Sequence, residues 1–452
     1  MTYDVINPAT EQVVQTIEMN DAESANAAVQ RAAAAFESWR TVSPADRARL
    51  LRRFADAVDS DIENLADLEV KEAGHTITNA RGEAENVRDV LHYFAGAVER
   101  HLGDQIPVEG GIDVTFHEPL GVVGIIVPWN FPMPIAGWGF APALAAGNTV
   151  VLKPAELTPL TAVRIGELAR EAGLPPDVLQ VLPGKGSIVG QAFTDHPRVA
   201  KIVFTGSSAV GKKILAGSAD TMKRTTLELG GKSANVIFHD ADIEQAAATA
   251  PYGVFDNAGQ DCCARSRLLV QRSVFDEFME LLEPAIAGVR VCDPADEKSE
   301  MGPLISAEQH RVVSSFLDDG ADVAFTGSAP NGPGYWFAPT VVIAGSPNDR
   351  IVTDEIFGPV VTVLPFDDEA DAIRIANDSI YGLSGSIWTE NVRRGLRVAR
   401  AIDSGALSLN SHAAVRYNTP FGGFKQSGIG RELGPHALDS FTETKNLFIA
   451  TT

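Results

Sequence analysis

The stretch from Gly121 to Leu152 constrains the fold more than any other part of this sequence. It contains no charged residue, and it is long enough to cross a lipid bilayer. However, Pro128, Pro132 and Pro142 interrupt it, with several glycines interspersed, and no continuous helix tolerates that density of breakers. We therefore expect a buried strand, a pocket wall, a short helix and a second buried strand, rather than a membrane span.

Strands and helices are predicted to alternate from Leu120 onward. Short β-branched runs bounded by glycine and proline are typical of buried strands. We expect such strands over residues 121–127, 149–152, 178–182, 201–204, 235–238 and 267–270. Helices are predicted between them, one capped at Thr158-Pro159 and another over 243–255. This alternation predicts parallel sheets covered by helices, and its restart after Gly231 predicts a second α/β domain.

The N-terminal part of the chain is predicted to be mainly helical. Helices should start at Asp21 and at Ser43-Pro44, and an amphipathic run over 86–102 closes this block. Alternating polarity predicts two further strands, over 112–118 and 440–449. No element follows the terminal strand, so we expect it to pair with a partner subunit in a homodimer or homotetramer.

The composition narrows the class of protein. The chain has 452 residues and a net charge of −22, so we expect two or three domains and neither a nucleic-acid nor a membrane partner. The N-terminus lacks the features of a signal peptide, and cysteines at 262, 263 and 292 make no disulfide framework. A cytoplasmic location is therefore predicted. The nine histidines show no metal-ligand spacing, and no metal is predicted.

Two of the three cysteines, Cys262 and Cys263, lie side by side in one loop. A thiolate is the strongest nucleophile among unmodified side chains near neutral pH. The alternative is that both are small buried hydrophobic residues, which is the commoner fate of a cysteine. Asp261, Gln260 and Arg265 flank the pair instead of an apolar run, and this favours a functional loop.

Three other short patterns suit a nucleotide or an acid–base role. Gly206-Ser207 follows a predicted strand and opens a helix, which suits a phosphate, and the turn around Gly186 is similar. Lys153 and Glu156 follow another strand, where they could bind ribose hydroxyls or form a surface ion pair. Glu228 lies between two leucines, where it could be a general base or a solvent-facing strand end.

Seven motifs in one order resemble the NAD(P)-dependent aldehyde dehydrogenase superfamily over nearly the whole chain. They are Pro128-Trp129-Asn130-Phe131-Pro132, Lys153-Pro154-Ala155-Glu156, Phe204-Thr205-Gly206-Ser207, Glu228-Leu229-Gly230-Gly231-Lys232, Gly259-Gln260-Asp261-Cys262, Glu355-Ile356-Phe357-Gly358-Pro359 and Pro420-Phe421-Gly422-Gly423-Phe424-Lys425. The resemblance implies an α/β dinucleotide-binding domain, a second α/β catalytic domain and a small β extension for oligomerisation. The implied segments are 1–102 with 120–230, then 231–425, and 103–119 with 436–452.

The same resemblance implies the catalytic roles. Cys262 would attack the aldehyde carbon, and Asn130 with the Cys262 backbone N–H would stabilise the oxyanion. Glu228 would activate the water that hydrolyses the thioester. Independently of the resemblance, Cys263 is expected to be a small residue packed behind the nucleophile, and a reversible cyclic oxidised state with Cys262 is the alternative.

The implied cofactor is NAD in preference to NADP. Matching positions hold the adenosine ribose, the pyrophosphate and the nicotinamide end. These positions are Trp129, Lys153, Glu156, Gly186, Gly206, Ser207, Glu355 and Phe357. A carboxylate at Glu156 accepts a hydrogen bond from a ribose 2′-hydroxyl but repels a 2′-phosphate, which favours NAD.

The substrate is expected to be a small aldehyde that enters through a tunnel. Residues at tunnel positions are Trp138, Asp261, Arg416, Tyr417 and Asn418. Asp261 favours a cationic ω-aminoaldehyde such as 4-aminobutanal, and some aminobutyraldehyde dehydrogenases carry a similar Gly-Gln-Asp-Cys. Arg416 favours a semialdehyde that bears a carboxylate, and both charges could also be solvated at the rim.

Three other functions are compatible with parts of the pattern. A CoA-acylating semialdehyde dehydrogenase is disfavoured by Glu228, which such relatives generally lack. A non-catalytic protein on the same fold is disfavoured because nucleophile, base, oxyanion donor and cofactor positions are all filled. A cysteine hydrolase would need a histidine base with its own orienting partner, which the sequence does not identify.

Overall fold

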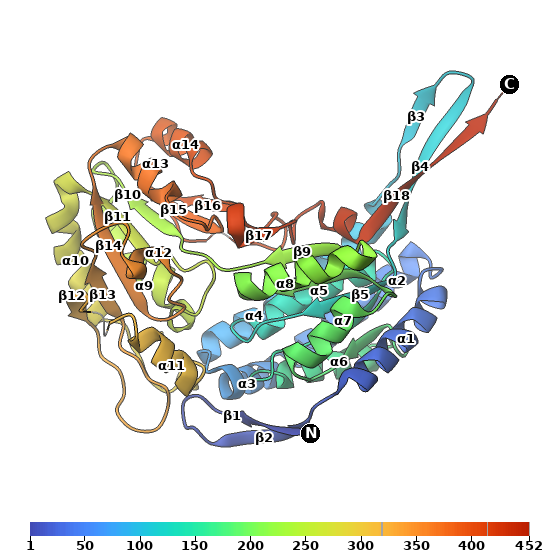
Figure 1. Ribbon diagram of the computed structural model, residues 1–452, viewed down its shortest axis with the longest axis horizontal. Helices are drawn as coiled ribbons and strands as arrows, with labels where there is room; N and C mark the ends of the chain where they lie inside the picture. Colours follow the sequence, from blue (N-terminus) through green and yellow to red (C-terminus); the bar gives the residue numbers. More distant parts are fainter. Residues whose placement is uncertain (318–319, 414, 452) are drawn as a thin grey trace.

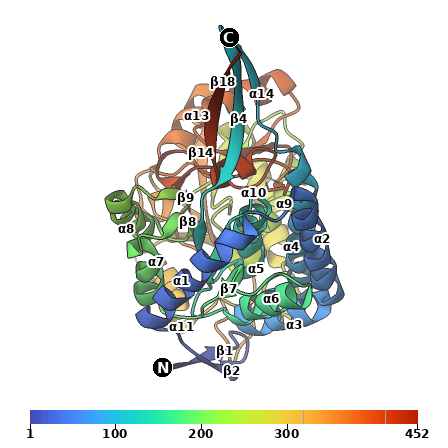
Figure 2. The ribbon, with the colours of Figure 1, turned by 90° about the vertical axis from the view of Figure 1, so that its right-hand side faces the viewer.

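A computed structural model describes residues 1–317, 320–413 and 415–451. Residues 318, 319 and 414, within the predicted segment 231–425, and 452, within 436–452, lie outside the described residues. The chain forms two sheet-and-helix bodies and a projecting arm of three strands (Figures 1 and 2). No helix among the described residues combines the length and apolar character needed to cross a membrane.

The first body is a six-stranded sheet with the order β17-β9-β8-β5-β6-β7. Its strands are β5 (Val122–Ile126), β6 (Thr149–Lys153), β7 (Leu179–Val181), β8 (Val199–Thr205), β9 (Arg224–Glu228) and β17 (Gly428–Ile429). All neighbouring pairs are parallel except β17 with β9. Helices α1 (Ala22–Trp39), α2 (Pro44–Ser60), α3 (Ile62–Ala73), α4 (Ile77–Ala97), α5 (Pro132–Ala145), α6 (Leu160–Glu171), α7 (Gln191–Asp195) and α8 (Ser208–Ser218) belong to this body.

Strand β5 shows why helices cover both faces of the first sheet. Side chains alternate along a strand, and every residue of β5 is buried. Val123 and Ile125 pack into the cluster formed with α2, α4, α5 and α6. Val122 and Ile126 pack on the other face, against residues of α1, α7 and α8. The uncharged stretch is therefore a strand between two helical layers, followed by the loop and helix that the prolines predict.

The second body is a seven-stranded sheet with the order β12-β13-β14-β11-β10-β15-β16, parallel except for β12. Its strands are β10 (Ala234–Ile237), β11 (Arg267–Gln271), β12 (Asp322–Thr326), β13 (Thr340–Ile343), β14 (Val360–Phe366), β15 (Ser384–Trp388) and β16 (Ala406–Leu409). Its helices are α9 (Ile243–Phe255), α10 (Phe275–Ala287), α11 (Ala307–Ser314), α12 (Arg350–Thr353), α13 (Glu369–Asn377) and α14 (Val392–Ala401). The parallel α/β class predicted for both bodies is confirmed.

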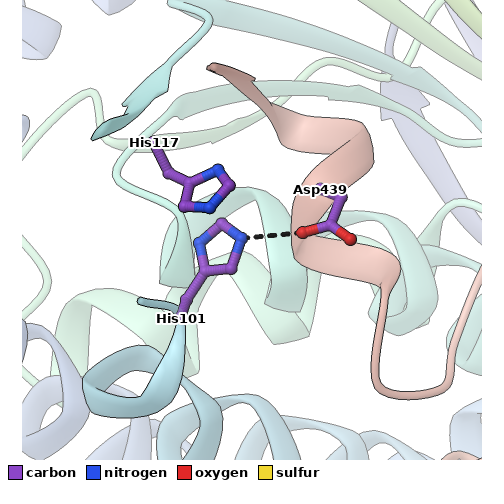
Figure 3. Close-up of side chains that lie close together, drawn as sticks. All are labelled: His101, His117 and Asp439. Atoms are coloured by element: carbon purple, nitrogen blue, oxygen red, sulfur yellow. Dashed lines mark hydrogen bonds and ion pairs between the residues drawn. The ribbon is translucent and has the colours of Figure 1, made fainter. Parts of the chain in front are cut away.

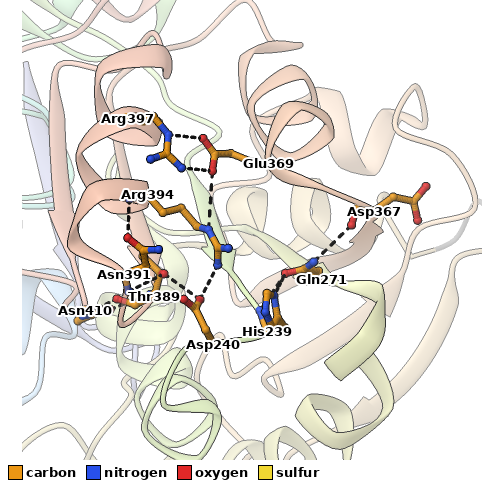
Figure 4. A network of polar contacts seen from close by, with 10 residues as sticks. All are labelled: His239, Asp240, Gln271, Asp367, Glu369, Thr389, Asn391, Arg394, Arg397 and Asn410. Atoms are coloured by element: carbon orange, nitrogen blue, oxygen red, sulfur yellow. Dashed lines mark hydrogen bonds and ion pairs between the residues drawn. The ribbon is translucent and has the colours of Figure 1, made fainter.

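A polar network closes the carboxyl edge of the second sheet (Figure 4). Asp240, just after β10, accepts from Arg394 of α14 at 2.7 Å and from Thr389 at 2.8 Å. Arg397 pairs with Glu369 at 2.8 Å on the same side. These hydrogen bonds and ion pairs connect the side chains at this edge to one another. The loop that precedes β11 lies at the opposite, amino edge, and it carries the two adjacent cysteines.

The projecting arm consists of β3 (Gln105–Val108), β4 (Gly111–Pro119) and β18 (Thr442–Ala450). Strand β18 pairs antiparallel with β4 over its full length, from Thr442 opposite Pro119 to Ala450 opposite Gly111. The terminal strand thus has a pairing partner within its own chain, which its position at the end of the sequence did not suggest. A separate hairpin, β1 (Thr2–Ile6) with β2 (Val13–Glu18), lies at the N-terminal end (Figure 1).

Two helix predictions differ from the structure. The run predicted over 86–102 is the second half of α4, which begins at Ile77, and α3 was not predicted. Thr158 does not cap α6; instead the buried Glu72 carboxylate accepts the N–H groups of Leu160 and Thr161 at 2.6 and 2.9 Å. That cap comes from a helix far away in sequence, so no local signal could reveal it.

Candidate active site

Two cavities meet at the cysteine loop, between the carboxyl edge of the first sheet and the amino edge of the second. One cavity has a volume of about 370 Å³ and the other about 240 Å³. Cys262, Glu228 and Thr205 line both of them. Glu228 and Thr205 end strands β9 and β8 of the first sheet, whereas Cys262 precedes β11 of the second. The fold therefore brings the predicted nucleophile and base to a shared boundary.

The cysteine loop is held in an unusual backbone conformation. Asn257, Ala258 and Gly259 all have positive φ, at 50°, 53° and 71°. Such values are costly for residues other than glycine, and they persist where surrounding contacts impose them. Asn257 supplies one contact, since its side-chain amide donates to the Asn130 carbonyl at 2.7 Å. Buried Arg265 supplies another by donating to the Cys263 carbonyl at 2.6 Å.

The Cys262 thiol is partly accessible, whereas Cys263 is buried in the hydrophobic core. Interaction with the Cys263 thiol, together with burial, raises the pKa of Cys262 well above its usual value. The nearby Asp261 carboxylate acts in the same direction, as expected from its position beside the nucleophile. Asp261 also accepts the Cys263 backbone N–H at 2.8 Å, so its charge helps to hold the loop. These effects favour the neutral thiol of Cys262 over its thiolate.

Asn130 follows β5 and lines the smaller cavity with Cys262. Its side-chain amide donates one hydrogen bond to the Gln260 carbonyl at 2.9 Å, which fixes its orientation. The second amide hydrogen remains available, and no described residue accepts the backbone N–H of Cys262. The ring of buried His75 interacts with the Asn130 carbonyl and packs against Phe131. Two donors near the thiol can thus stabilise an oxyanion.

Glu228 is buried, and neither of its carboxylate oxygens has a hydrogen-bond partner among the described residues. Burial and the neighbouring Glu432 raise the pKa of Glu228 well above its usual value. A carboxyl group with a raised pKa is suited to accept a proton near neutral pH. The absence of a side chain at Gly422 leaves space beside the Glu228 carboxyl group. The Cβ of any other residue at position 422 would lie 2.7 Å from Glu228 Oε1.

The smaller cavity contains most of the residues predicted to hold the cofactor. Trp129, Gly206, Ser207, Glu355 and Phe357 all line it. The Trp129 and Phe357 rings meet edge to face, with centroids 5.3 Å apart, one from each body. Glu355 accepts the Gly231 N–H at 2.8 Å, and burial raises the pKa of Glu355 to about 7.

The other predicted cofactor residues form a second group, outside the lining of this cavity. Lys153 ends β6, and its ammonium lies 3.2 Å from Glu156 Oε2. Glu156 Oε1 accepts the Gly186 N–H at 2.8 Å, so the three residues are in contact. They lie, like Gly206, after strands of the first parallel sheet. Carboxyl edges of such sheets are where dinucleotides bind, and both groups of residues fit that geometry.

The larger cavity has an acidic lining. Five carboxyl groups contribute to it, and no lysine or arginine among the described residues does. These acidic residues are Glu83, Glu228, Asp256, Asp261 and Glu432. Trp138 also lines this cavity, as predicted for a tunnel residue. Arg416, Tyr417 and Asn418 are exposed and lie outside the lining, and the Arg416 guanidinium is directed to the Ala413 carbonyl at 3.4 Å.

Three of these acidic residues were not identified from the sequence. Glu83 lies on α4 and contacts His75 at 2.6 Å, and Glu432 follows β17, so neither is near the cysteines in sequence. Burial raises the pKa of Glu432 to about 7. Asp256 precedes Asn257 in the cysteine loop itself. This position in the sequence could have identified Asp256 as a candidate site residue. Burial and Asp261 raise the pKa of Asp256 to about 6.

Comparison with known proteins identifies the family. Residues 1–447 match the sequence profile of the Aldehyde dehydrogenase family. An aldehyde dehydrogenase of Emericella nidulans is 41% identical, covering 99% of this chain and 91% of the relative. The phenylacetaldehyde dehydrogenase of Pseudomonas fluorescens is 40% identical, covering 99% of this chain and 93% of the relative. The crystal structure of betaine aldehyde dehydrogenase from Staphylococcus aureus in complex with NAD+ superimposes with a TM-score of 0.97 at 38% identity, covering 100% of this chain and 92% of that one. The chain therefore belongs to the aldehyde dehydrogenase family.

Proposed function

We propose that this protein oxidises an aldehyde to the carboxylic acid, with NAD as hydride acceptor and water as the acyl acceptor. The observation that carries the proposal is that Cys262 and Glu228 line both cavities. An aldehyde in the larger cavity and a nicotinamide in the smaller one would approach the same thiol from two sides. A nucleophile, a base and an oxyanion site then surround one reacting carbon.

The chain's own groups would carry the chemistry in sequence. The Cys262 thiol gives up its proton to solvent, and its sulfur then attacks the aldehyde carbon, forming a thiohemiacetal oxyanion that Asn130 and the Cys262 N–H stabilise. When bound, NAD would supply the hydride acceptor for oxidation of this adduct to a thioester. Glu228 then removes a proton from water, hydroxide adds to the thioester carbon, and the carbon–sulfur bond breaks. The carboxylic acid leaves and Cys262 is regenerated.

We also propose that the protein prefers NAD to NADP, because of the Glu156 carboxylate. Both of its oxygens already have partners, Lys153 and the Gly186 N–H, which hold the carboxylate in place at the sheet edge. A fixed anion beside an adenosine ribose accepts a 2′-hydroxyl proton and repels a 2′-phosphate. The Staphylococcus aureus relative was crystallised with NAD+, which supports the same cofactor here.

The substrate is proposed to carry a positive charge, as an ω-aminoaldehyde such as 4-aminobutanal does. Support comes from the lining of the larger cavity, where the described residues include no lysine or arginine and the pKa of the Asp256 carboxyl, raised only to about 6, leaves it mainly ionised at neutral pH. Betaine aldehyde, the substrate named for one relative, is also a cation, whereas phenylacetaldehyde, named for another, is uncharged. Trp138, Tyr252 and Phe421 add aromatic faces that suit a cation or an aromatic ring.

A substrate panel separates these cases. NADH production is measured with 4-aminobutanal, succinic semialdehyde and an uncharged aldehyde of similar length, each with NAD and with NADP. We expect the highest kcat/KM for 4-aminobutanal with NAD. Equal kcat/KM values for the three aldehydes would reject the proposal of a cationic substrate. The proposal of NAD-linked aldehyde oxidation would still stand. Turnover without any nicotinamide cofactor would reject the oxidation.

Self-association through the arm is proposed as well. Apolar side chains of the arm are exposed in the single chain, including Ile106, Phe116, Leu447, Phe448 and Ile449. Strand β18 also lies at the edge of its sheet, where backbone groups can pair with another chain. A homodimer or homotetramer would cover these groups, and a monomeric mass in solution would contradict this.

The three free cysteines accord with the predicted cytoplasmic location.

A further inference from the structure

A cluster of metal-ligating side chains lies at the base of the arm, apart from both active-site cavities. It contains His101, His117 and Asp439 (Figure 3). His101 follows the short helical turn that ends α4, His117 is on β4, and Asp439 is in the turn just before β18. One ligand atom from each residue lies within 4.8 Å of the other two. Three separate segments thus converge on one point.

The side chains of the cluster contact one another through an ion pair and a stack of two imidazole rings. His101 Nε2 lies 2.8 Å from Asp439 Oδ1, and the two imidazole rings have centroids 4.0 Å apart. His436, which is exposed, brings its Nδ1 to 3.3 Å from the other oxygen of Asp439. Two to three imidazoles and one carboxylate are therefore available, which is the ligand set that zinc and related ions prefer.

The hydrogen bonding of His117 leaves one nitrogen unused. Its Nε2 contacts the Leu102 carbonyl at 3.1 Å, and a carbonyl only accepts, so Nε2 carries the proton. Nδ1 then keeps its lone pair, and this atom is buried without any partner among the described residues. A histidine that donates one N–H to a backbone carbonyl and keeps a free lone pair is in the state that binds a metal.

We propose that His101, His117 and Asp439 bind a divalent transition ion such as Zn²⁺, with His436 beside Asp439 as the fourth ligand. Bonds of about 2.0–2.2 Å require ligand atoms roughly 3.3–3.5 Å apart. Binding therefore requires the ligand atoms to move by about an ångström and the stacked rings of His101 and His117 to turn until their nitrogen lone pairs converge. The ion replaces the proton between His101 Nε2 and Asp439, and that proton passes to solvent. Binding is therefore weaker at low pH.

The surroundings of the cluster contain a cavity and charged side chains of both signs. A cavity of about 330 Å³ is lined by His101 and His117 together with Arg47 and Glu118. Arg47 donates to the carbonyls of Val42 and Ala145, which keeps its guanidinium occupied. The Asp439 carboxylate offsets part of the added positive charge, whereas Glu118 is already paired with Arg40 and Lys445. A bound ion would join the end of α4, strand β4 and the entry to β18, and so stiffen the base of the arm.

The test measures Zn²⁺ binding to full-length protein without an affinity tag. The background carries Cys262→Ser and Cys263→Ser, because Asp261 and the two thiols form another group of potential ligands. Competition with a chromogenic chelator at pH 8 should detect about one site that His117→Phe or Asp439→Asn weakens at least about tenfold. Removing one ligand from a three- or four-ligand site has this size of effect.

Matched controls decide between the site and nonspecific binding. His92→Asn changes a partly exposed histidine on α4, outside the cluster, and should leave the affinity unchanged. Excess Zn²⁺ should raise Tm in the background protein but not in Asp439→Asn, since binding to the folded state stabilises it. Asp439 is half exposed, so this variant keeps the test valid if His117→Phe fails to fold. Equal Zn²⁺ affinity in the background, His117→Phe and Asp439→Asn proteins would overturn the proposal.

Discussion

Cys262 and Glu228 are the two reactive groups that line both the acidic cavity and the cavity of the predicted cofactor residues. They come from different sheets, one before β11 and one at the end of β9. The crossing from β9 to β10 passes against the backbone of the cysteine loop, because a Cβ on Gly231 would lie 2.2 Å from the Cys262 carbonyl oxygen. This close approach, possible only without a side chain, is what brings nucleophile and base to one boundary.

Replacing Cys262 with alanine should abolish turnover. Without the sulfur no covalent adduct forms, so NADH production should fall by at least about a thousandfold. Cys263→Ala provides the matched control, because Cys263 packs in the core and should affect the rate only modestly. If Cys262→Ala retained activity and Cys263→Ala lost it, the assignment of the nucleophile would be wrong.

Replacing Glu228 with glutamine should separate the two halves of the reaction. Attack by Cys262 and hydride transfer remain, whereas water is no longer activated. We expect a burst of about one NADH per active site, followed by slow turnover, as accumulation of an acyl-enzyme requires. Stopped-flow absorbance detects the burst, and mass spectrometry detects the acylated chain. A proportional loss of both burst and steady rate would contradict the role of Glu228 as the base for hydrolysis.

Replacing Glu156 with glutamine should reduce the preference for NAD. Glutamine can still accept the Gly186 N–H, so the local structure should persist while the negative charge is lost. The ratio of kcat/KM for NAD to that for NADP should fall by about tenfold, equivalent to ~1.4 kcal/mol. The exposed Glu37→Gln serves as the control for a change of net charge alone. An unchanged ratio would show that Glu156 does not select the cofactor.

The sequence predicted the fold well where a signal is local. Ser43 followed by Pro44 begins α2, and the pattern over 243–255 coincides with α9. Burial of β5 on both faces follows from its uncharged, β-branched composition. These features depend on residues within a few positions of each other, so they can be read from the chain.

Contacts between distant segments could not be predicted in the same way. Glu72 caps α6 across 88 residues, and Glu432 reaches Glu228 only because β17 joins the first sheet. The histidines of the arm cluster meet an aspartate more than 300 positions later. Cys262 and Glu228 were identified through sequence motifs. A motif indicates which residues a folded site uses, but it does not show the contacts that bring those residues together.

Replacing Asp256 with asparagine tests the charge of the substrate. The Asp256 carboxylate accepts from Asn79 at 2.5 Å and lines the larger cavity. The asparagine amide has the same shape as the aspartate carboxylate, but it carries no charge and so cannot attract a cation. We expect kcat/KM for 4-aminobutanal to fall by about tenfold, with little change for an uncharged aldehyde of similar length. Exposed Glu277→Gln is the control, and an equal fall for both substrates would indicate a structural role for Asp256 instead.

Glu432 should make the protein less stable as pH rises through neutrality. Burial raises the pKa of Glu432 from about 4.5 to about 7, so the folded state holds its proton more tightly than the unfolded state does. The free energy of unfolding should therefore decrease between about pH 4.5 and 7, by up to about 3 kcal/mol for this group. Urea unfolding at pH 5 and 7.5, at one protein concentration, measures this change.

Glu432→Gln should flatten that pH dependence, because an amide does not titrate. The neighbouring Lys201 has a pKa lowered to about 8 by burial, so it titrates mainly above the measured window. Other buried carboxyl groups, such as Glu72 with a pKa raised to about 7, keep part of the slope. The exposed Glu280→Gln should retain the full slope. If Glu432→Gln lost as much stability between pH 5 and 7.5 as the unmodified protein, folding would not raise the pKa of the Glu432 carboxyl, and this prediction would be wrong.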